Sequence, residues 1–319
     1  ATDAREAVAT LLPWLLHKGL LSRCKASQTL SLVTLQRMVK AADGSALRPH
    51  LALLVATLVE ALSALEPAAL QYMQFHAESQ LDMTQESMER LRLSLARAGP
   101  LQEALDCCYK HIDGAAAEDL MPRLMALLRS GVGLATRSAS AFLVLTLCEK
   151  TPRQVRDASN RLLPTLTNAA LSERSAALRS TYASAVAAVA RLAPPARATH
   201  LVRQLCKLFR ESDPALDARQ RRVAAVLLHD VCLRAGSALA PPMTAATAAA
   251  TAAAWGGSSG GGWAAALPLA FVARHDPEEA VAAAFSGAWA EGLMQMQLGA
   301  VPTGDVAVRN AKDALGLML

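Results

Sequence analysis

The sequence predicts an all-α protein built as an α-solenoid of stacked helix pairs, and three observations lead to this fold class. Alanine and leucine dominate the 319 residues, while aromatic residues make up only 4% and charged residues 18%. Runs in which β-branched and polar residues alternate, the usual signal of strands, are nearly absent. A leucine-rich motif containing proline also recurs along the chain. Such self-similarity at a roughly fixed period is typical of repeat architectures.

The repeated motif places a proline among leucines at helical spacing. Its copies centre on Pro13, Pro49, Pro122, Pro164 and Pro268. The first four prolines are separated by 36, 73 and 42 residues, and the middle interval is close to two units. A helical unit that recurs every ~36–47 residues is the signature of HEAT-like or armadillo-like arrays. We therefore expect about six helix pairs, whose stacking creates an extended surface for binding other proteins.

Prolines, glycines and apolar periodicity define the first two helix pairs. The first helix runs from Asp3 to Leu21, with a bend at Pro13, because proline removes one backbone hydrogen bond. The second begins near Ala26 and is stopped by Asp43-Gly44, and the third carries Pro49 near its first turn, where the missing N–H does no harm. The apolar residues of that third helix fit the pattern i, i+3, i+4, i+7. They are Leu51, Leu54, Val55, Leu58 and Leu62.

The pattern weakens between Glu66 and Gly99 and then becomes regular again. The stretch from Gln71 to Arg90 is rich in Gln, Met, Glu and Ser, which indicates a partly exposed helix or an excursion from the array. A helix then extends from Pro100 to Ile112. Next comes a helix with Leu120, Leu124, Leu127 and Leu128 on one face, a glycine turn, and a helix at 135–147 that carries Phe142 and Leu145.

Two further pairs lead to a change in composition. Helices are expected from Pro152 and over 173–192, and another pair over 196–235 is divided near Pro214. We assign residues 1–236 to a HEAT-like array and residues 237–262 to a flexible Ala/Thr/Gly-rich insertion. Such low-complexity sequence buries too little apolar surface to offset its ordering entropy. Residues 263–319 continue the array and end in a poorly defined tail.

Several blocks of these repeats resemble a known family. The blocks are residues 120–137, 47–54 with 62–67, and 266–276, and the most specific part is Arg129-Ser130-Gly131-Val132-Gly133-Leu134. In this order they are similar to the large HEAT-repeat adaptor and scaffold proteins of the proteasome, within the C-terminal half of a much longer chain. The resemblance implies a fragment of a longer array. It also implies an adaptor that tethers or braces the core and regulatory particles of the 26S proteasome and has no chemistry of its own.

Motifs that suggest catalysis or a cofactor have simpler structural interpretations. The Gly131–Gly133 turn follows a helix and lacks Gly-Lys-Ser/Thr, so it does not read as a phosphate loop. His200, His229-Asp230 and Asp276 offer the ligand types of a metal-dependent phosphohydrolase, but a low-complexity tract separates Asp276 from the others. The thiols of Cys107 and Cys108 point about 100° apart on a helix, which does not suit a shared metal. We therefore predict no catalytic, cofactor-binding or metal site and no small-molecule substrate.

Charge, hydropathy and cysteine usage narrow the class of partner. The net charge of +5 is mild and spread along the chain, and aromatic residues for base stacking are scarce, which argues against nucleic acid. The stretch from Ala240 to Trp255 is too polar to insert well into a membrane, and the charged start does not resemble a signal peptide. The six cysteines lack framework spacing, so reduced thiols in the cytoplasm or nucleus are expected.

Arginines near helix ends are the candidate protein contacts. Arg129 and Arg137 flank the glycine turn, and Arg219, Arg221 and Arg222 cluster at the start of a helix, where the helix dipole disfavours positive charge. Arginines at such turns could meet acidic partner surfaces, and a solvated basic face is the alternative. The other functional hypotheses are an adaptor for a transport or translation assembly, a sequence-tolerant RNA-binding array and the metal-dependent phosphohydrolase.

Overall fold

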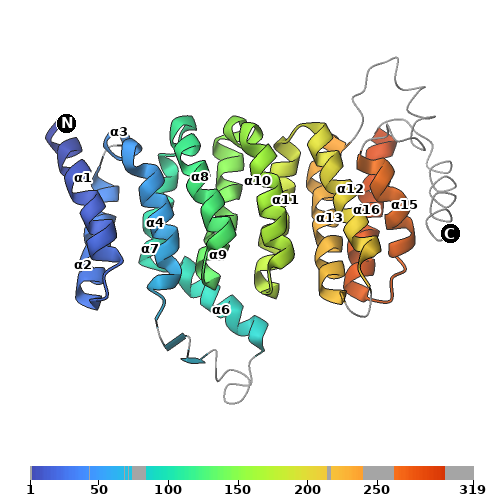
Figure 1. Cartoon of the computed structure of the whole chain (residues 1–319), viewed down its shortest axis with the longest axis horizontal. Coiled ribbons are helices and arrows are strands. Elements are labelled where there is room, and N and C mark those ends of the chain that lie inside the picture. The colour runs from blue at the N-terminus through green and yellow to red at the C-terminus, as the bar shows by residue number, and fades with distance from the viewer. Residues whose placement is uncertain are drawn as a thin grey trace. The chain divides into compact units, whose positions relative to one another are not determined.

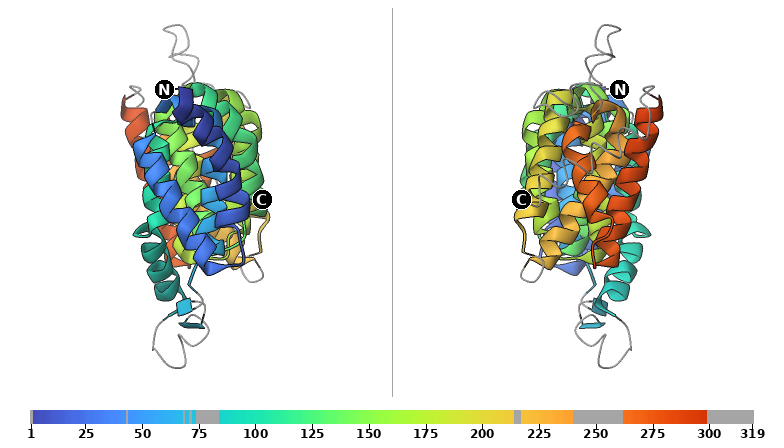
Figure 2. Two further views of the ribbon diagram at one scale, coloured as in Figure 1. Left: turned by 90° about the vertical axis from the view of Figure 1, so that its left-hand side faces the viewer. Right: turned by 90° about the vertical axis from the view of Figure 1, so that its right-hand side faces the viewer.

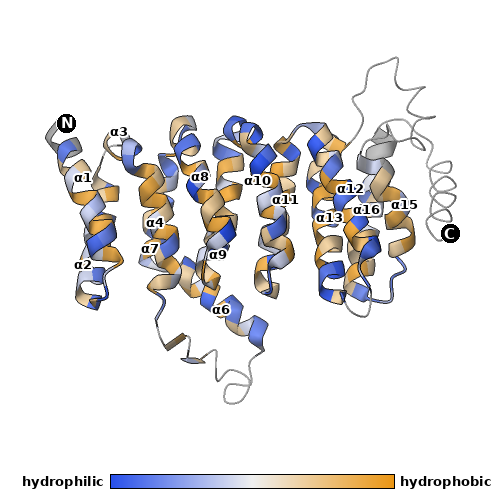
Figure 3. Ribbon diagram, in the orientation of Figure 1, coloured by the Kyte–Doolittle hydropathy of each residue, from blue (hydrophilic) through white to orange (hydrophobic). Residues whose placement is uncertain are grey.

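The computed structural model describes residues 2–42, 44–67, 69–70, 72–73, 84–213, 217–239 and 262–298. Their regular secondary structure is helical throughout, as Figure 1 shows. The chain divides into two compact units, one of residues 1–154 with 173–181 and one of residues 155–172 with 182–319. Apolar and polar residues share most of the helices in Figure 3, in keeping with the amphipathic pattern that predicted these elements.

The first helix pair of unit 1 shows how a proline changes helix type. Helix α1 (Thr2–Trp14) contains Pro13 and continues directly into a π-helix, η1 (Leu15–Leu20). The Leu21 N–H donates to the Leu16 carbonyl over 3.3 Å, which is the wider spacing of a π-turn. The predicted bend at Pro13 is therefore a local widening of the helix. Helix α2 (Lys25–Ala41) packs against η1 and buries Leu35 and Val39.

The second pair contains the most apolar helix of unit 1. Helix α3 (Gly44–Leu47) and a 3₁₀ turn, η2 (Arg48–His50), lead into α4 (Leu51–Ala64). All five apolar residues predicted for this helix are buried. No membrane insertion was predicted from the sequence, yet Gly44–Ala64 has the length and composition of a membrane span. Its apolar window is 67% buried, and buried core helices pass the same test, so the stretch is weak evidence for a span.

An excursion separates α4 from the helix that pairs with it. Helix α7 (Pro100–Lys110) packs against α4 and α2, while α6 (Gln85–Arg97) lies between them in sequence and packs against α9. Figure 1 shows α6 running obliquely to α4 and α7. Thr84 caps α6, because its Oγ1 accepts the Ser87 N–H at 3.2 Å. The prediction of a partly exposed helix or an excursion from Gln71 to Arg90 therefore agrees with the structure for residues 84–90, whereas residues 71 and 74–83 lie outside the described part.

The third pair of unit 1 consists of α8 (Gly114–Ser130) and α9 (Leu134–Lys150). Asp113 caps α8 by accepting the Ala116 N–H at 2.9 Å. The four leucines predicted for the inner face of α8 are buried. Phe142 on α9 is 44% exposed, because small residues such as Ala139 and Ala141 occupy the closely packed positions of this helix.

Unit 2 contains the more regular stacking. It comprises most of α10 (Pro152–Ser172) and α11 (Ala176–Leu192), followed by α12 (Pro195–Glu211), α13 (Ala218–Leu239), α15 (Gly262–Ala273) and α16 (Glu279–Leu298). Helix α12 packs on α13 and α15, and α16 packs on α15 and α13. The right-hand view of Figure 2 shows these four helices lying along one another. Two helix pairs thus stack as repeats.

The helices of the described residues form six consecutive pairs, as expected from the sequence. The pairs are α1–η1 with α2, α4 with α7, α8 with α9, α10 with α11, α12 with α13, and α15 with α16. The all-α solenoid class of HEAT-like helix pairs is therefore confirmed. Most of the predicted insertion, residues 240–261, and the predicted tail, residues 299–319, lie outside the described part. The flanking residues Ser237–Leu239 and Gly262 belong to α13 and α15.

Candidate protein-contact site

The turn between α8 and α9 is anchored to the end of α4. Gly133 has a φ of 89°, and a Cβ there would lie 2.4 Å from the Ser63 Oγ, so only glycine fits without movement. The Thr136 N–H donates to the Ser63 Oγ at 2.9 Å, and the Thr136 Oγ1 donates to the Val59 carbonyl at 2.9 Å. Val132 is 84% exposed at the tip of this turn. The turn is thus a fixed projection, as a contact site requires.

The two arginines that flank this turn have different environments. The Arg137 Nη1 donates to both carboxylate oxygens of Glu173 at 2.8 Å. The Glu173 side chain is only 1% exposed and also accepts the Ser175 N–H at 2.8 Å. Arg129 is exposed in the last turn of α8, where the helix dipole favours positive charge. Arg137 therefore compensates a buried acid, while the Arg129 side chain reaches the surface.

The arginine cluster at the start of α13 binds the turn between α15 and α16. The Arg221 Nη2 forms an ion pair with Asp276, whose side chain is 5% exposed, and its guanidinium lies 4.0 Å from the Phe209 ring centroid. Arg222 pairs with Glu278. Arg219 is exposed. The acids of the following helix pair offset the positive charge that the α13 dipole disfavours.

Three of the predicted contact arginines, Arg137, Arg221 and Arg222, bind acidic side chains of this chain. Arg137 and Arg221 are partly buried in these pairs, whereas Arg222 is exposed, as are Arg129 and Arg219. Sequence reasoning missed the acids because they lie 36 to 56 residues away. The helical repeat carries such distant residues next to one another. A contact role for the five arginines remains a prediction.

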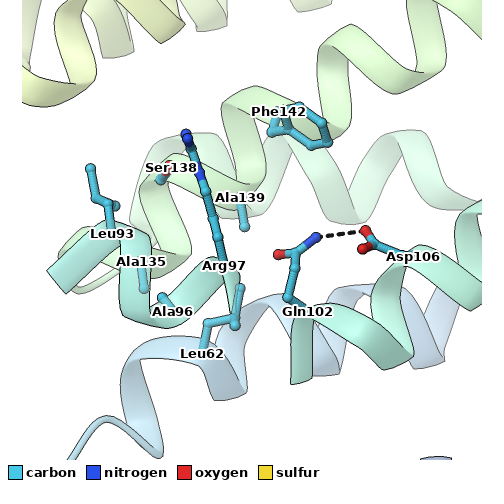
Figure 4. Close-up of a pocket in the computed structure, with 10 residues that line it drawn as sticks. All are labelled: Leu62, Leu93, Ala96, Arg97, Gln102, Asp106, Ala135, Ser138, Ala139 and Phe142. Atoms are coloured by element: carbon cyan, nitrogen blue, oxygen red, sulfur yellow. Dashed lines mark hydrogen bonds between the residues drawn. The ribbon is translucent and has the colours of Figure 1, made fainter. Parts of the chain in front are cut away.

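A half-open pocket, which was not predicted from the sequence, lies among four helices of unit 1. It has a volume of about 270 Å³, and Figure 4 shows its lining on α4, α6, α7 and α9. Leu62 and Leu93 contribute buried apolar surface, and the half-exposed Phe142 belongs to the same lining. The Gln102 Nε2 donates to the Asp106 carboxylate at 2.8 Å. Only the placement of α6 beside α9 reveals this pocket.

The residues that suggested metal chemistry have other contacts. The His229 Nδ1 lies 3.3 Å from Asp230, whose other oxygen accepts the Ser184 hydroxyl at 3.3 Å. The His229 ring also packs on Gly287, where a Cβ would lie 2.5 Å from Nε2. Asp276 is paired with Arg221. Across the described ranges, no group of three or more His, Cys, Asp or Glu side chains is placed to hold a metal ion.

The cysteines, all six within the described ranges, form no disulfide. Burial raises the pKa of the Cys108 and Cys206 thiols to about 12 and raises the pKa of Cys232 as well. The exposed Cys24 differs, because hydrogen bonds from the Ser27 backbone and side chain lower its pKa. Three thiols are thus held protonated inside the helix pairs, where they pack as small apolar groups.

Comparisons with known proteins find relatives of one kind. A family described as proteasome adapter and scaffold protein ECM29, HEAT-repeat domain, matches residues 47–210. The human proteasome adapter and scaffold protein ECM29 is 32% identical over 209 residues, which are 66% of this chain and 11% of that protein. The proteasome component ecm29 of Schizosaccharomyces pombe is 23% identical over 240 residues, 74% of this chain and 14% of that protein.

A third relative is the proteasome-associated protein ECM29 homolog of Drosophila melanogaster. It is 25% identical over 203 residues, which are 64% of this chain and 11% of that protein. The chain thus spans between 11% and 14% of the length of the curated relatives it matches.

Proposed function

We propose a function for this chain from the premise that it belongs to the family of the proteasome adapter and scaffold protein ECM29, as the match to the family's HEAT-repeat domain shows. The chain is a non-catalytic adaptor segment that binds the 26S proteasome. It helps to tether or stabilise the proteasome, with contacts to the core and regulatory particles. The family match carries the proposal, because it spans the consecutive helix pairs from α4 to α12.

The helix pairs support a mechanism based on many small contacts. Each pair presents its own turn and outer helix face, so the surface grows with the number of repeats. Linked weak contacts raise the effective concentration of the next one, and an array can bind tightly without any single strong site. Arg129, Arg219 and the projecting Val132 are the proposed contacts. In this proposal, Arg137, Arg221 and Arg222 hold in place the helices and turns that carry the proposed contacts.

The proposed location is the cytoplasm and nucleus. Reduced cysteines persist in these compartments, and none of the six cysteines is in a disulfide. Fractionation of cells that express the tagged chain would test this. Recovery in a secretory compartment would contradict it.

Co-sedimentation tests the proposed function directly. The purified chain is mixed with intact 26S proteasome and, separately, with free core and regulatory particles, and the pelleted fraction is measured over a range of chain concentration and salt. An unrelated HEAT protein of similar size controls for non-specific adhesion. Saturable binding that the control lacks is the expected result. A folded chain that pellets no more than the control with all three particles would overturn the proposal.

A further inference from the structure

The outer face of α10 and α12 in unit 2 is strongly basic. On residues 155–172 and 195–211 there are six Lys or Arg side chains and two acids, Asp157 and Glu211, whereas the whole chain carries 32 basic and 27 acidic residues. We call this surface the α10–α12 face. Its basic residues are Arg156, Arg161, Arg197, Arg203, Lys207 and Arg210, and all are exposed.

A shallow groove connects the two helices of this face. Asn160 and Pro164 of α10 and Arg197, His200 and Gln204 of α12 belong to its lining, and its volume is about 30 Å³. A volume of this size holds about one water, so the groove is a seam and not a pocket for a buried ligand. Its polar edges instead suit a segment that lies along the surface and places polar or charged groups into the seam.

The contacts of Lys207 and Arg156 leave the positive charge of these two side chains largely in place. Lys207 lies 3.7 Å from Glu211, and both side chains are more than 60% exposed, so this pair contributes little. The Arg156 Nε donates to the Leu192 carbonyl at 3.1 Å, which satisfies a donor and leaves the charge in place. Neither α10 nor α12 has an acid in its first turn, although the helix dipole favours one there. Arg197 occupies the first turn of α12 instead.

We propose that the α10–α12 face is a docking surface for an acidic segment of a partner protein, in which two or more Asp or Glu side chains lie along the seam. Carboxylates near Arg197 would complement both its guanidinium and the positive end of α12, and Arg binds carboxylates through two parallel hydrogen bonds. The side chains of Asn160, His200 and Gln204 supply further polar partners along the groove. The inference rests on the proposed function only in taking the partner to be a protein.

The composition of the face favours a protein over a nucleic acid. Proteins that bind single strands without sequence preference combine a basic groove with aromatic side chains for base stacking. The only Phe, Tyr or Trp on these two helices is Phe209, which is 3% exposed beneath Arg221. A basic surface without exposed aromatic side chains for base stacking matches an acidic peptide better than a single-stranded nucleic acid.

A charge-reversal pair tests the inference on the whole chain. The variant is Arg161→Glu/Arg197→Glu, and the matched control is Arg23→Glu/Arg37→Glu, which alters net charge equally at exposed positions of unit 1. The probes are a fluorescent decapeptide of glutamate, the same peptide of glutamine, and a single-stranded DNA of ten nucleotides, each followed by anisotropy at two salt concentrations. Circular dichroism verifies that both variants fold.

The expected result is binding of the glutamate peptide that weakens by at least about tenfold in Arg161→Glu/Arg197→Glu, because like charges now face each other. The affinity of the control variant for the glutamate peptide should change by less than about twofold, and the glutamine peptide should not bind. Equal loss in variant and control, or no loss in either, would overturn the inference. Tighter binding of the DNA than of the glutamate peptide would overturn it in favour of a nucleic-acid surface.

Co-sedimentation of the same variants separates this inference from the proposed function. If the natural chain pellets with the proteasome and the variant does not, both stand. If both pellet equally, the docking surface falls and the adaptor function stands. If neither pellets while the glutamate peptide still requires Arg161 and Arg197, the adaptor function falls and the docking surface stands.

Discussion

Two arginine-rich regions of unit 2 look alike in sequence and differ in structure. At the start of α13, Arg221 and Arg222 bind Asp276 and Glu278 of the α15–α16 turn. On the α10–α12 face, six basic side chains share the surface with two acids. The first region uses its arginines to join helix pairs, and the second presents an excess of positive charge at the surface. An arginine cluster therefore joins elements where a packed neighbour brings acids to it, and we propose a docking surface where basic residues outnumber the acids of their own helices.

The largest expected effect is the loss of stability in Arg221→Ala. The substitution leaves the Asp276 carboxylate nearly buried without its cation and removes the guanidinium from the Phe209 ring. Breaking such a buried pair from one side costs about 3 kcal/mol of unfolding free energy. Urea denaturation followed by circular dichroism measures it. The neighbouring Arg219→Ala is the control and should change the unfolding free energy by less than about 0.5 kcal/mol. Equal effects of the two substitutions on the unfolding free energy would contradict the view that Arg221 joins helix pairs and Arg219 does not.

The Arg137→Ala variant extends the comparison to unit 1, with a smaller effect. Glu173 is as buried as Asp276, and each of these carboxylates also accepts a backbone N–H, but Arg137 is 34% exposed whereas Arg221 is only 17% exposed. We expect a loss of about 2 kcal/mol in the same assay. The control is Arg123→Ala on the exposed side of α8. A loss of unfolding free energy no larger than that of Arg123→Ala would show that the buried Glu173 carboxylate does not need Arg137 as its partner.

The reactivity of Cys206 reports whether α12 stays seated. Its thiol is 1% exposed beside the Ala265 carbonyl of α15, and burial raises its pKa to about 12. The reactive thiolate is therefore scarce at pH 8, and modification requires local opening. Maleimide labelling mapped by mass spectrometry should leave Cys206 unmodified in Arg161→Glu/Arg197→Glu. In Arg221→Ala the labelling should accelerate by about a hundredfold, in proportion to the lost stability.

Labelling of Cys24 provides the internal reference. Its thiol is exposed and its pKa is lowered, so it should react first and at the same rate in every variant. Fast labelling of Cys206 in Arg161→Glu/Arg197→Glu would mean that the basic side chains of the α10–α12 face hold α12 in place, which contradicts a role confined to docking.

The smallest expected effect is a gain in stability from Arg197→Glu alone. The side chain lies in the first turn of α12, where a carboxylate interacts favourably with the helix dipole. The expected gain is about 0.3–1 kcal/mol in unfolding free energy, and salt should reduce it. Arg197→Gln is the matched neutral control, and its unfolding free energy should lie between those of the natural chain and Arg197→Glu. A loss of stability would show that Arg197 serves the fold and not a partner.

The sequence was sufficient for the helices, because their signals are local. Pro100 and Pro152 begin helices as predicted, and the leucines of α4 and α8 are buried at the predicted spacing. The family resemblance was also visible in the order of the leucine-rich blocks. It is the longer-range pairing of α4 with α7 across the excursion that needed the structure.

The candidate contacts were less predictable, because charge compensation is not local. Arg221 and Asp276 are 55 residues apart, and the sequence near each residue gives no sign that the two form a pair. The helix that carries Phe142 was predicted, yet the 44% exposure of this side chain was not. The α10–α12 face was overlooked for a related reason. Its charges belong to helices separated by α11, and only stacking places them on one surface.

The division between arginines that hold the fold and arginines that bind a partner is best tested by comparing Arg161→Glu/Arg197→Glu with Arg221→Ala. Glutamate-peptide anisotropy and urea denaturation are measured on both variants, and we expect opposite outcomes. The first variant loses at least about tenfold in peptide affinity while its unfolding free energy is unchanged or slightly raised. The second loses about 3 kcal/mol of unfolding free energy and, under conditions where it is folded, binds the peptide as the natural chain does. Loss of both properties in both variants, or of neither, would contradict the division.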